Sequence, residues 1–350
     1  MHYSTLGHSG INVSRVCLGT MTWGKQNSQS DANAQIEYAL AQGVNFIDTA
    51  EMYAVPPTAE TYGTTETIIG NWLAANPTRR SEFILASKIA GNGLPYIRGG
   101  SDITGESILQ AVDDSLARLQ TNYIDLYQLH WPNRTSPHFG KHAPGRVNFS
   151  QVNSAEQSAQ MLDILQALDA CVKAGKIRHF GLSDDTPWGI NEYIRLSEQH
   201  NLTRVTAIQN EFNLLHSKDW PYLIENCVHQ QVAYLPWSPL ATGALTGKYL
   251  NGARPSDSRW NFIQRNGLFR DTEQSNAAVA AYCEVAQKHG LTPAQLALAW
   301  CNQVDGVTST IIGATNLAQL KENINAFELT LSDNVLQDIA EVHKQYPSPF

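Results

Sequence analysis

The sequence predicts an α/β fold in which eight parallel strands close into a (β/α)8 TIM barrel. Short apolar runs alternate with amphipathic stretches along the chain, and eight such strand–helix units favour a closed barrel over an open sheet. Each run is rich in Val, Ile, Leu or Phe and too short for a helix, as is typical of a strand buried on both faces. The predicted strands are Val16–Gly19, Val44–Asp48, Phe83–Lys88, Ile124–His130, Ile177–Ser183, Val205–Asn210, Val232–Trp237 and Thr308–Gly313.

Amphipathic stretches separate these runs and carry apolar residues at helical spacing. A Rossmann sheet would show G-x-G-x-x-G after its first strand, whereas this chain continues as Gly19-Thr20-Met21-Thr22-Trp23-Gly24. The barrel is therefore the better prediction. The predicted helices are Asp31–Gln42, Ser107–Leu119, Gln157–Ala174, Thr186–Gln199, Ser275–His289 and Leu317–Asn325.

Both ends of the chain add an element to the predicted barrel. Tyr3–Leu6 and Val13–Arg15 flank the turn His8-Ser9-Gly10 and predict a β-hairpin that closes the bottom of the barrel. Asp333–His343 predicts an extra C-terminal helix that packs outside it. We expect residues 1–350 to form one domain, because α/β barrels of this length are routinely single domains.

Composition narrows the functional class. The formal net charge of −8 argues against a nucleic-acid surface, and no apolar run of about 18 residues predicts a membrane span. The N-terminal segment lacks the basic and apolar regions of a signal peptide, so we expect a cytoplasmic protein. The five cysteines include no C-x-x-C pair, which indicates reduced thiols and no metal site. No short motif indicates the oligomeric state.

Three segments are longer than barrel turns require, and all three follow predicted strand ends. They are Tyr53–Thr64, Trp131–Ala155 and Leu240–Gln274. Barrel enzymes build their sites from the loops at the carboxyl ends of the strands. Long loops on that face predict a substrate pocket.

Four residues whose side chains can transfer or stabilise a proton lie at the carboxyl ends of three consecutive predicted strands. Asp48 and Tyr53 follow the second strand, Lys88 ends the third, and His130 ends the fourth. Taken singly, such an Asp is more often a turn residue, such a Lys a solvated surface charge, and such a His a hydrogen-bonded filler. Their shared place at one rim of the barrel favours a common site.

Motifs along nearly the whole chain resemble the aldo-keto reductase superfamily, a group of (β/α)8 barrels with a Tyr-Lys-Asp-His tetrad. The loop Tyr53-Ala54-Val55-Pro56-Pro57 and the long segment after the fourth strand are similar to the bacterial Tas-like branch, which is close to the potassium-channel β-subunits. The motifs are D-T-A-E-M-Y at 48–53, A-S-K at 86–88, D-L-Y-Q-L-H-W at 125–131, G-K-I-R-H-F-G-L-S at 175–183, Q-N at 209–210, W-S-P-L at 237–240, T-G-K-Y at 246–249 and I-I-G-A-T-N-L-A-Q-L-K-E-N at 311–323.

Elementary chemistry assigns roles to the tetrad. Carbonyl reduction needs a hydride at carbon and a proton at oxygen, and the phenol of Tyr53 has an ordinary pKa of about 10. The ammonium of Lys88 is expected to lower that pKa, and Asp48 to hold Lys88 charged and in place. His130 is expected to donate a hydrogen bond to the substrate oxygen. The hydride must come from a cofactor, because no side chain donates one.

The resemblance implies NADPH/NADP+ as that cofactor. Ser183, Asp184 and Gln209 would hold its carboxamide, Trp237 would stack on its ring, and Lys248 and Arg259 would pair with its 2′-phosphate. Asp184 replaces the usual Asn, Trp237 replaces a frequent Tyr, and Gly313-Ala314 with Gln319 replaces a Lys-Ser pair and an Arg found in some members. The implied cofactor contacts are Thr20, Ser183, Asp184, Gln209, Trp237, Ser238, Pro239, Leu240, Gly243, Leu245, Lys248, Arg259, Gly313, Thr315, Gln319, Glu322 and Asn323.

The expected function is NADPH-dependent reduction of small-molecule aldehydes or ketones, with Trp23 and Trp131 at an apolar substrate pocket. Two alternatives stay open at this point. One is an NADP(H)-binding regulatory or partner subunit with slow reductase activity, since the channel β-subunits use this fold. The other is a dehydrogenase that runs toward oxidation.

Overall fold

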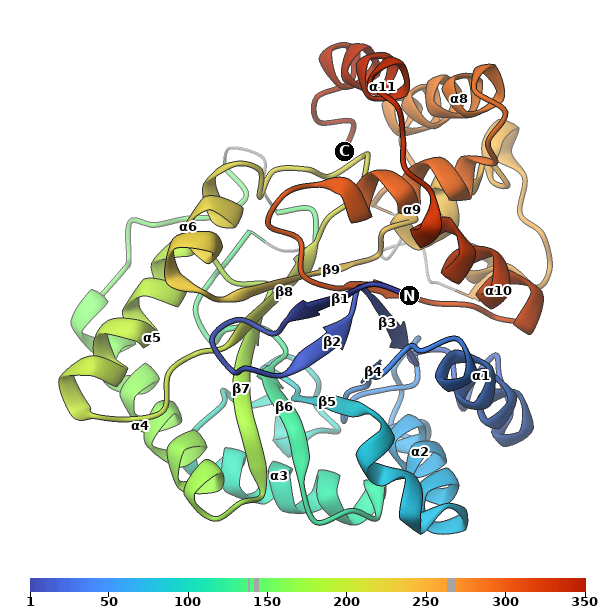
Figure 1. The fold of residues 1–350 in the computed structure, drawn as a ribbon. Helices are drawn as coiled ribbons and strands as arrows, with labels where there is room; N and C mark the ends of the chain where they lie inside the picture. The colour runs from blue at the N-terminus through green and yellow to red at the C-terminus, as the bar shows by residue number, and fades with distance from the viewer. Residues whose placement is uncertain (138, 142–144, 263–268) are drawn as a thin grey trace.

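The computed structural model describes residues 1–137, 139–141, 145–262 and 269–350. Eight parallel strands form one sheet, and helices surround it (Figure 1). The strands neighbour one another in the order β10-β3-β4-β5-β6-β7-β8-β9. Thr308, just before the last strand, donates from its backbone N–H to the Tyr234 carbonyl at 2.9 Å, which brings the two ends of the sheet together. The predicted barrel is confirmed. The strands are β3 (Val16–Gly19), β4 (Phe46–Asp48), β5 (Ile84–Ile89), β6 (Ile124–Leu129), β7 (Ile177–Ser183), β8 (Ala207–Glu211), β9 (Ala233–Trp237) and β10 (Thr310–Ile312).

The helices begin at polar caps. Most of these cap side chains accept a hydrogen bond from the backbone N–H three residues later, which pairs an N–H group that has no partner within the helix. Examples are Ser28, Thr104, Thr186, Thr272 and Thr292. The α-helices are α1 (Gln29–Ala41), α2 (Thr64–Ala75), α3 (Gly105–Leu119), α4 (Ser154–Lys173), α5 (Pro187–His200), α6 (Tyr222–Gln230), α7 (Arg259–Phe262), α8 (Glu273–Lys288), α9 (Pro293–Gln303), α10 (Leu317–Asn325) and α11 (Asp333–Gln345). Short 3-10 turns include η1 (Pro77–Glu82), η2 (Arg98–Gly100), η3 (Ala241–Thr246), η4 (Leu250–Gly252) and η6 (Ala326–Glu328).

The N-terminal hairpin closes one end of the barrel, as predicted. Strands β1 (Tyr3–Thr5) and β2 (Asn12–Ser14) pair antiparallel and lie across the barrel (Figure 1). Leu6 and Val13 are fully buried in the same cluster as the inward-facing Phe46, Leu126 and Leu235 of the barrel strands. The hairpin therefore supplies the floor of the barrel interior.

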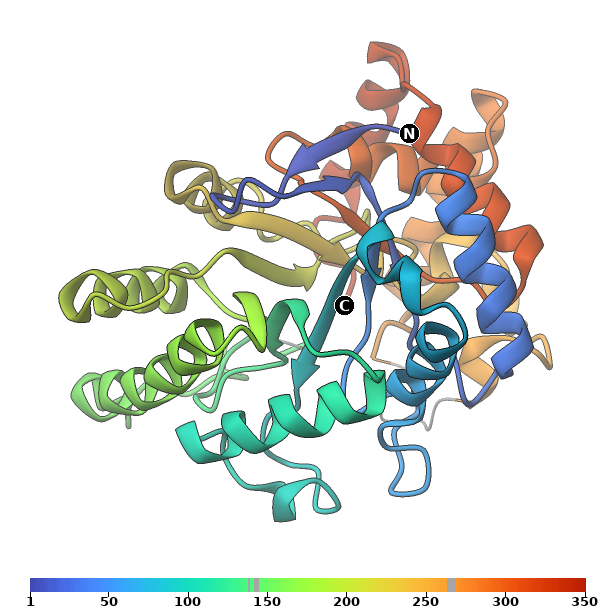
Figure 2. The same ribbon diagram turned by 60° about the horizontal axis from the view of Figure 1, so that its bottom comes forward.

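The C-terminal helix α11 packs against α8, outside the barrel (Figures 1 and 2). Val335, Ile339 and Val342 turn inward and join an apolar cluster that is separate from the barrel core. The predicted extra helix is confirmed by this packing. Within the described ranges, no helix is both long enough and apolar enough to span a membrane.

Candidate active site

A cavity of about 770 Å³ opens where the barrel strands end at their carboxyl termini. That size suits a small organic ligand or cofactor. Asp48, Tyr53, His130 and Trp131 line one part of it, and Lys88 lies buried next to them. Residues expected at a cofactor also line it: Thr20, Ser183, Asp184, Gln209, Trp237, Ser238, Pro239, Leu240, Gly243, Lys248, Arg259, Gly313, Thr315, Gln319, Glu322 and Asn323.

The structure pairs Lys88 with Asp48 inside the barrel. The two side chains are almost completely buried, and Lys88 Nζ lies 2.5 Å from Asp48 Oδ2. Lys88 Nζ also donates to the Thr49 carbonyl at 2.8 Å. The other Asp48 oxygen accepts from Gln128 Nε2 at 3.2 Å and from Gln209 Nε2 at 2.9 Å. Both charges are therefore compensated and held rigidly.

Sequence reasoning did not single out Gln128, although a signal was present. Side chains two residues apart on a strand share a face, so Gln128 must point the same way as His130. A polar residue on the inward face of a buried strand needs a partner there.

Tyr53 and His130 lie above the buried pair. Lys88 Nζ is 5.2 Å from the centroid of the Tyr53 ring, and the Tyr53 and His130 ring centroids are 5.6 Å apart in an edge-to-face arrangement. The structure thus brings all four predicted tetrad residues together. A phenol and an imidazole face the same cavity over a fixed ammonium.

Lys88 lowers the pKa of Tyr53, as expected, but burial has the larger and opposite effect. Burial raises the pKa of Tyr53 above its ordinary value, and the charges of Lys88 and Arg259 offset only part of this rise. For Lys88, burial favours the neutral amine, but Asp48 and Tyr53 together raise its pKa. At neutral pH the site therefore holds a neutral phenol beside an ammonium.

The two tryptophans expected at the substrate pocket occupy different places. Trp131 lines the cavity and its indole N–H donates to the Asn92 carbonyl at 3.2 Å. A Cβ on Gly91 would lie 2.1 Å from Trp131 Nε1, so only glycine admits the ring. Trp23 is a correction: it is fully buried in the barrel's outer core, and its N–H donates to Gln35 of α1 at 3.2 Å. The chain turns after β3 and carries this side chain away from the cavity.

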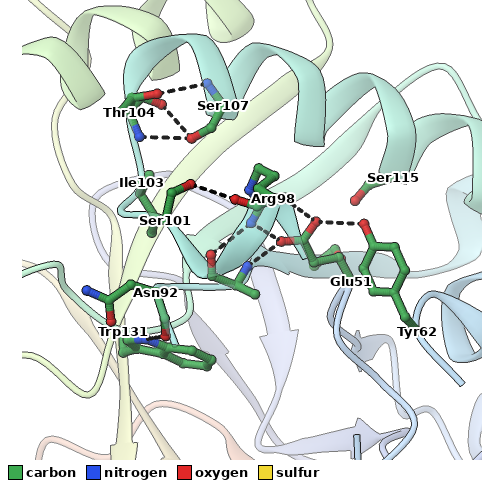
Figure 3. A network of polar contacts seen from close by, with 12 residues as sticks. Glu51, Tyr62, Asn92, Arg98, Ser101, Ile103, Thr104, Ser107, Ser115 and Trp131 are labelled. Atoms are coloured by element: carbon green, nitrogen blue, oxygen red, sulfur yellow. Dashed lines mark hydrogen bonds and ion pairs between the residues drawn. The ribbon is translucent and has the colours of Figure 1, made fainter. Parts of the chain in front are cut away.

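Figure 3 shows a second ion pair, between Glu51 and Arg98. Glu51 is fully buried, and Arg98 of η2 donates to both of its oxygens, at 2.6 and 3.0 Å. Arg98 also donates to the Ala90 carbonyl at 2.9 Å, and Tyr62 reaches Glu51 at 3.4 Å. The pair ties the segment that carries Tyr53 to the segment that supports Trp131. Sequence reasoning missed it because the two residues are far apart along the chain.

Polar groups with free hydrogen-bonding capacity face the cavity beside Trp237. Within the described part of the chain, the Ser183 hydroxyl and the Gln209 side-chain oxygen have no hydrogen-bond partner. Among the residues that the structure describes, the Asp184 carboxyl accepts a hydrogen bond only from Trp237 Nε1, at 3.2 Å. Arg270 lies 5.8 Å from the Trp237 ring and forms a buried ion pair with Glu211 at 2.6 Å. A donor and acceptor set of this kind fits a primary amide next to an aromatic ring.

The loop before α10 forms another part of the wall. Gln319 Oε1 accepts from the backbone N–H of Thr315 at 3.0 Å, and Asn323 Nδ2 donates to the Gly313 carbonyl at 3.1 Å. Lys248 and Arg259 also reach the cavity, and neither pairs with an acidic side chain in the ranges that the structure describes. Unpaired cations at a cavity wall fit an anionic ligand group.

Leu245, which was predicted to contact the cofactor, lies in a different environment. Its side chain is 1% exposed and packs in the apolar cluster beneath α8, so it is not part of the cavity wall. The tight η3 turn, with positive φ at Thr242 and Gly243, points Gly243 toward the cavity and Leu245 away from it.

No cluster of three or more His, Cys, Asp or Glu side chains suited to a metal ion occurs among the described residues. We therefore expect EDTA to leave steady-state activity unchanged. Activity that is lost on chelation and restored by zinc or magnesium would contradict this prediction. Treatment with a mild reductant serves as a parallel check on the cysteines, all five of which are unpaired.

The chain matches the family described as Aldo/keto reductase family over residues 15–344. It is 45% identical to "Protein tas" of Escherichia coli (strain K12) over 352 residues, which cover 100% of this chain and 99% of that protein. An uncharacterized oxidoreductase of Bacillus subtilis (strain 168), YrpG, is 28% identical over 354 residues, covering 100% and 97%. A probable voltage-gated potassium channel subunit beta of Arabidopsis thaliana is 29% identical over 355 residues, covering 99% and 98%.

Proposed function

The chain is an oxidoreductase that belongs to the aldo/keto reductase family, and we propose that it reduces the carbonyl group of aldehydes or ketones with NADPH. The observation that carries the proposal is the position of Tyr53, a buried phenol that faces the cavity above the Lys88–Asp48 pair. A phenol above an ammonium can give a proton to a carbonyl oxygen and remain stabilised as the phenolate.

The four tetrad side chains divide the proton chemistry among them. Tyr53 holds the proton that the substrate oxygen receives, and Lys88 stabilises the negative charge left on the phenol. Asp48 keeps Lys88 charged at 2.5 Å. His130, on the same wall, orients the carbonyl by a hydrogen bond to its oxygen. Trp131 bounds the pocket and excludes water on that side.

The residues opposite the tetrad fit a nicotinamide dinucleotide. Ser183 and Gln209 would hold the carboxamide, Trp237 would support the ring, and the Gly313–Asn323 segment would border the adenosine phosphates. When bound, the reduced nicotinamide supplies the hydride for the carbonyl carbon. Lys248 and Arg259, which form no salt bridge with any described residue, would face its phosphate groups.

The choice of NADPH over NADH can be tested at Lys248, which is exposed at the cavity edge and has no acidic partner among the described residues. One charge-assisted contact contributes about 1.5–3 kcal/mol. Lys248→Ala should weaken NADPH binding by roughly tenfold or more and leave NADH binding nearly unchanged. Fluorescence titration with both cofactors measures this. An equal loss for both would remove Lys248 from the 2′-phosphate site.

A cofactor-binding partner subunit is the competing function, because one relative is described as a probable potassium channel subunit beta. The complete tetrad favours an enzyme. Steady-state oxidation of NADPH with 4-nitrobenzaldehyde separates the two functions: turnover supports the reductase, whereas tight NADPH binding without turnover supports the partner subunit. The same assay with NADP+ and an alcohol measures the opposite direction.

A further inference from the structure

Asp184 differs from the other buried acidic residues of this chain. Nine Asp and Glu side chains are buried among the described residues, and eight of them pair with an Arg or Lys. Asp184 is the ninth, and no basic side chain within the described ranges forms a salt bridge with it. A buried carboxyl without a cation is costly when charged, so its place at the cavity calls for a reason. The eight paired residues are Asp48, Glu51, Glu66, Asp125, Asp169, Asp185, Glu192 and Glu211.

The backbone holds the Asp184 carboxyl at the cavity wall. Asp184 follows β7 with a φ of 51°, a left-handed conformation that Asn and Asp tolerate better than most residues. Its N–H donates to the Gln209 carbonyl at 3.1 Å, and its carbonyl accepts from Ser136 Oγ at 2.8 Å. One carboxyl oxygen accepts from Trp237 Nε1, which places the group at the edge of that indole.

The charged groups around Asp184 do not offset a negative charge on its carboxyl. Glu211 on β8 is already paired with Arg270, and Asp219 accepts hydrogen bonds from Tyr234 and Asn210. The neighbouring Asp185 is paired with Arg134 of the loop after β6. Burial, reinforced by Glu211, raises the pKa of Asp184 well above its ordinary value, while Trp237 and Arg270 act in the opposite direction. Burial without a basic partner therefore favours the neutral form of Asp184, which has the same shape as Asn and can donate one hydrogen bond.

A nicotinamide ring that serves Tyr53 and lies on Trp237 must pass close to this carboxyl. The oxidised ring carries a positive charge and the reduced ring carries none. We propose that Asp184 senses the oxidation state of the cofactor: it releases its proton to solvent when NADP+ binds and keeps the proton when NADPH binds. This inference rests on the proposed function, and it gives the Asp-for-Asn replacement a role that Asn cannot perform.

The direction in which NADP+ affinity changes with pH follows from the coupling of proton release to cofactor binding. A positive ring stabilises the carboxylate, so the pKa of Asp184 falls on NADP+ binding and a proton leaves. Affinity for NADP+ should then rise with pH, by up to about tenfold per pH unit for a full proton released. The reduced ring is neutral, so it covers the Asp184 carboxyl without stabilising the carboxylate. The affinity for NADPH should therefore not rise with pH in this way. Both cofactors carry the same 2′-phosphate, and protons exchanged there cancel in the difference.

Isothermal titration calorimetry in phosphate and Tris buffers tests the proposal, because these buffers differ in ionisation enthalpy and the difference in heat counts protons. The wild-type protein should release about 0.5–1 proton more with NADP+ than with NADPH near neutral pH. Asp184→Asn keeps the shape and the hydrogen-bonding groups but cannot titrate, and it should abolish the difference. Asp219→Asn is the matched control: Asp219 also has a raised pKa, of about 6, but lies outside the cavity wall, and its replacement should leave the difference intact.

Each outcome is decisive. Equal proton release with both cofactors in the wild-type protein would overturn the inference without requiring any variant to fold, and so would a difference that persists in Asp184→Asn. A difference that disappears in Asp219→Asn but persists in Asp184→Asn would assign it to Asp219 instead. Failure of both cofactors to bind, in calorimetry and in fluorescence titration alike, would overturn the proposed function itself, and with it this inference.

Discussion

Tyr53→Phe is expected to slow carbonyl reduction by about 10²–10⁴-fold, while NADPH affinity stays within a few-fold. The substitution keeps the ring in its place against His130 and removes only the hydroxyl that holds the proton. We expect the upper part of that range, because the substrate oxygen also loses a positioning contact. Single-turnover reduction by folded protein with bound NADPH measures this step without contributions from product release.

The competing explanation is that Tyr53 only packs within its loop beneath Pro56 and Pro57. It predicts a less stable protein with a near-normal rate in the folded fraction, and such a rate would remove the whole tetrad assignment. Tyr62→Phe is the matched control. Tyr62 lies in the same loop region and donates to Glu51, but it does not line the cavity, so its loss should change the rate by no more than a few-fold.

Lys88→Met should damage both the chemistry and the fold. Without the ammonium, the pKa of Tyr53 rises further above its ordinary value, since Lys88 is the largest influence that opposes burial there. Asp48 is left buried without its partner, and breaking a buried pair in this way costs about 3–5 kcal/mol of folding free energy. We expect a rate loss similar to that of Tyr53→Phe, measured by single turnover, together with a lower urea midpoint.

A double variant separates these two effects of Lys88. Asp48→Asn combined with Lys88→Met removes both charges, and Asn can still hydrogen-bond to Gln128 and Gln209. Stability should recover in part, because no uncompensated charge remains, but the rate should not. A normal single-turnover rate in Lys88→Met would exclude Lys88 from the proton chemistry.

The strands of this protein were predictable because each is a short, continuous apolar run between polar turns. Val16–Gly19 and Ile177–Ser183 begin and end at the residues that the sequence indicates. The helices α2, α6 and α9 were not predicted. In α9, Ala294, Leu296 and Ala299 face different sides of the helix and all are buried, so the apolar residues form no single stripe of the kind that predicts a helix.

The candidate site was predictable to the extent that barrel topology alone dictates it. Strand ends meet at one rim in a closed barrel, so Asp48, Lys88 and His130 had to converge once eight strands were recognised. Barrel topology does not fix the direction in which a side chain points once the chain has left the strand. For that reason Trp23 and Leu245 were assigned to the wrong environment, and the Glu51–Arg98 pair was not foreseen. That residues 1–350 form one domain stays a prediction.

The sequence by itself predicted the barrel, the meeting of Asp48, Tyr53, Lys88 and His130 at one rim, and the Asp at position 184, because these depend on residue type and on position along strands. Only the tertiary structure decided how those groups ionise. Burial outweighs the effect of Lys88 on Tyr53, and Asp184 is left without the basic partner that every other buried acid has among the described residues. A pKa depends on how much water and which charges surround a group, and segments distant in the sequence bring both.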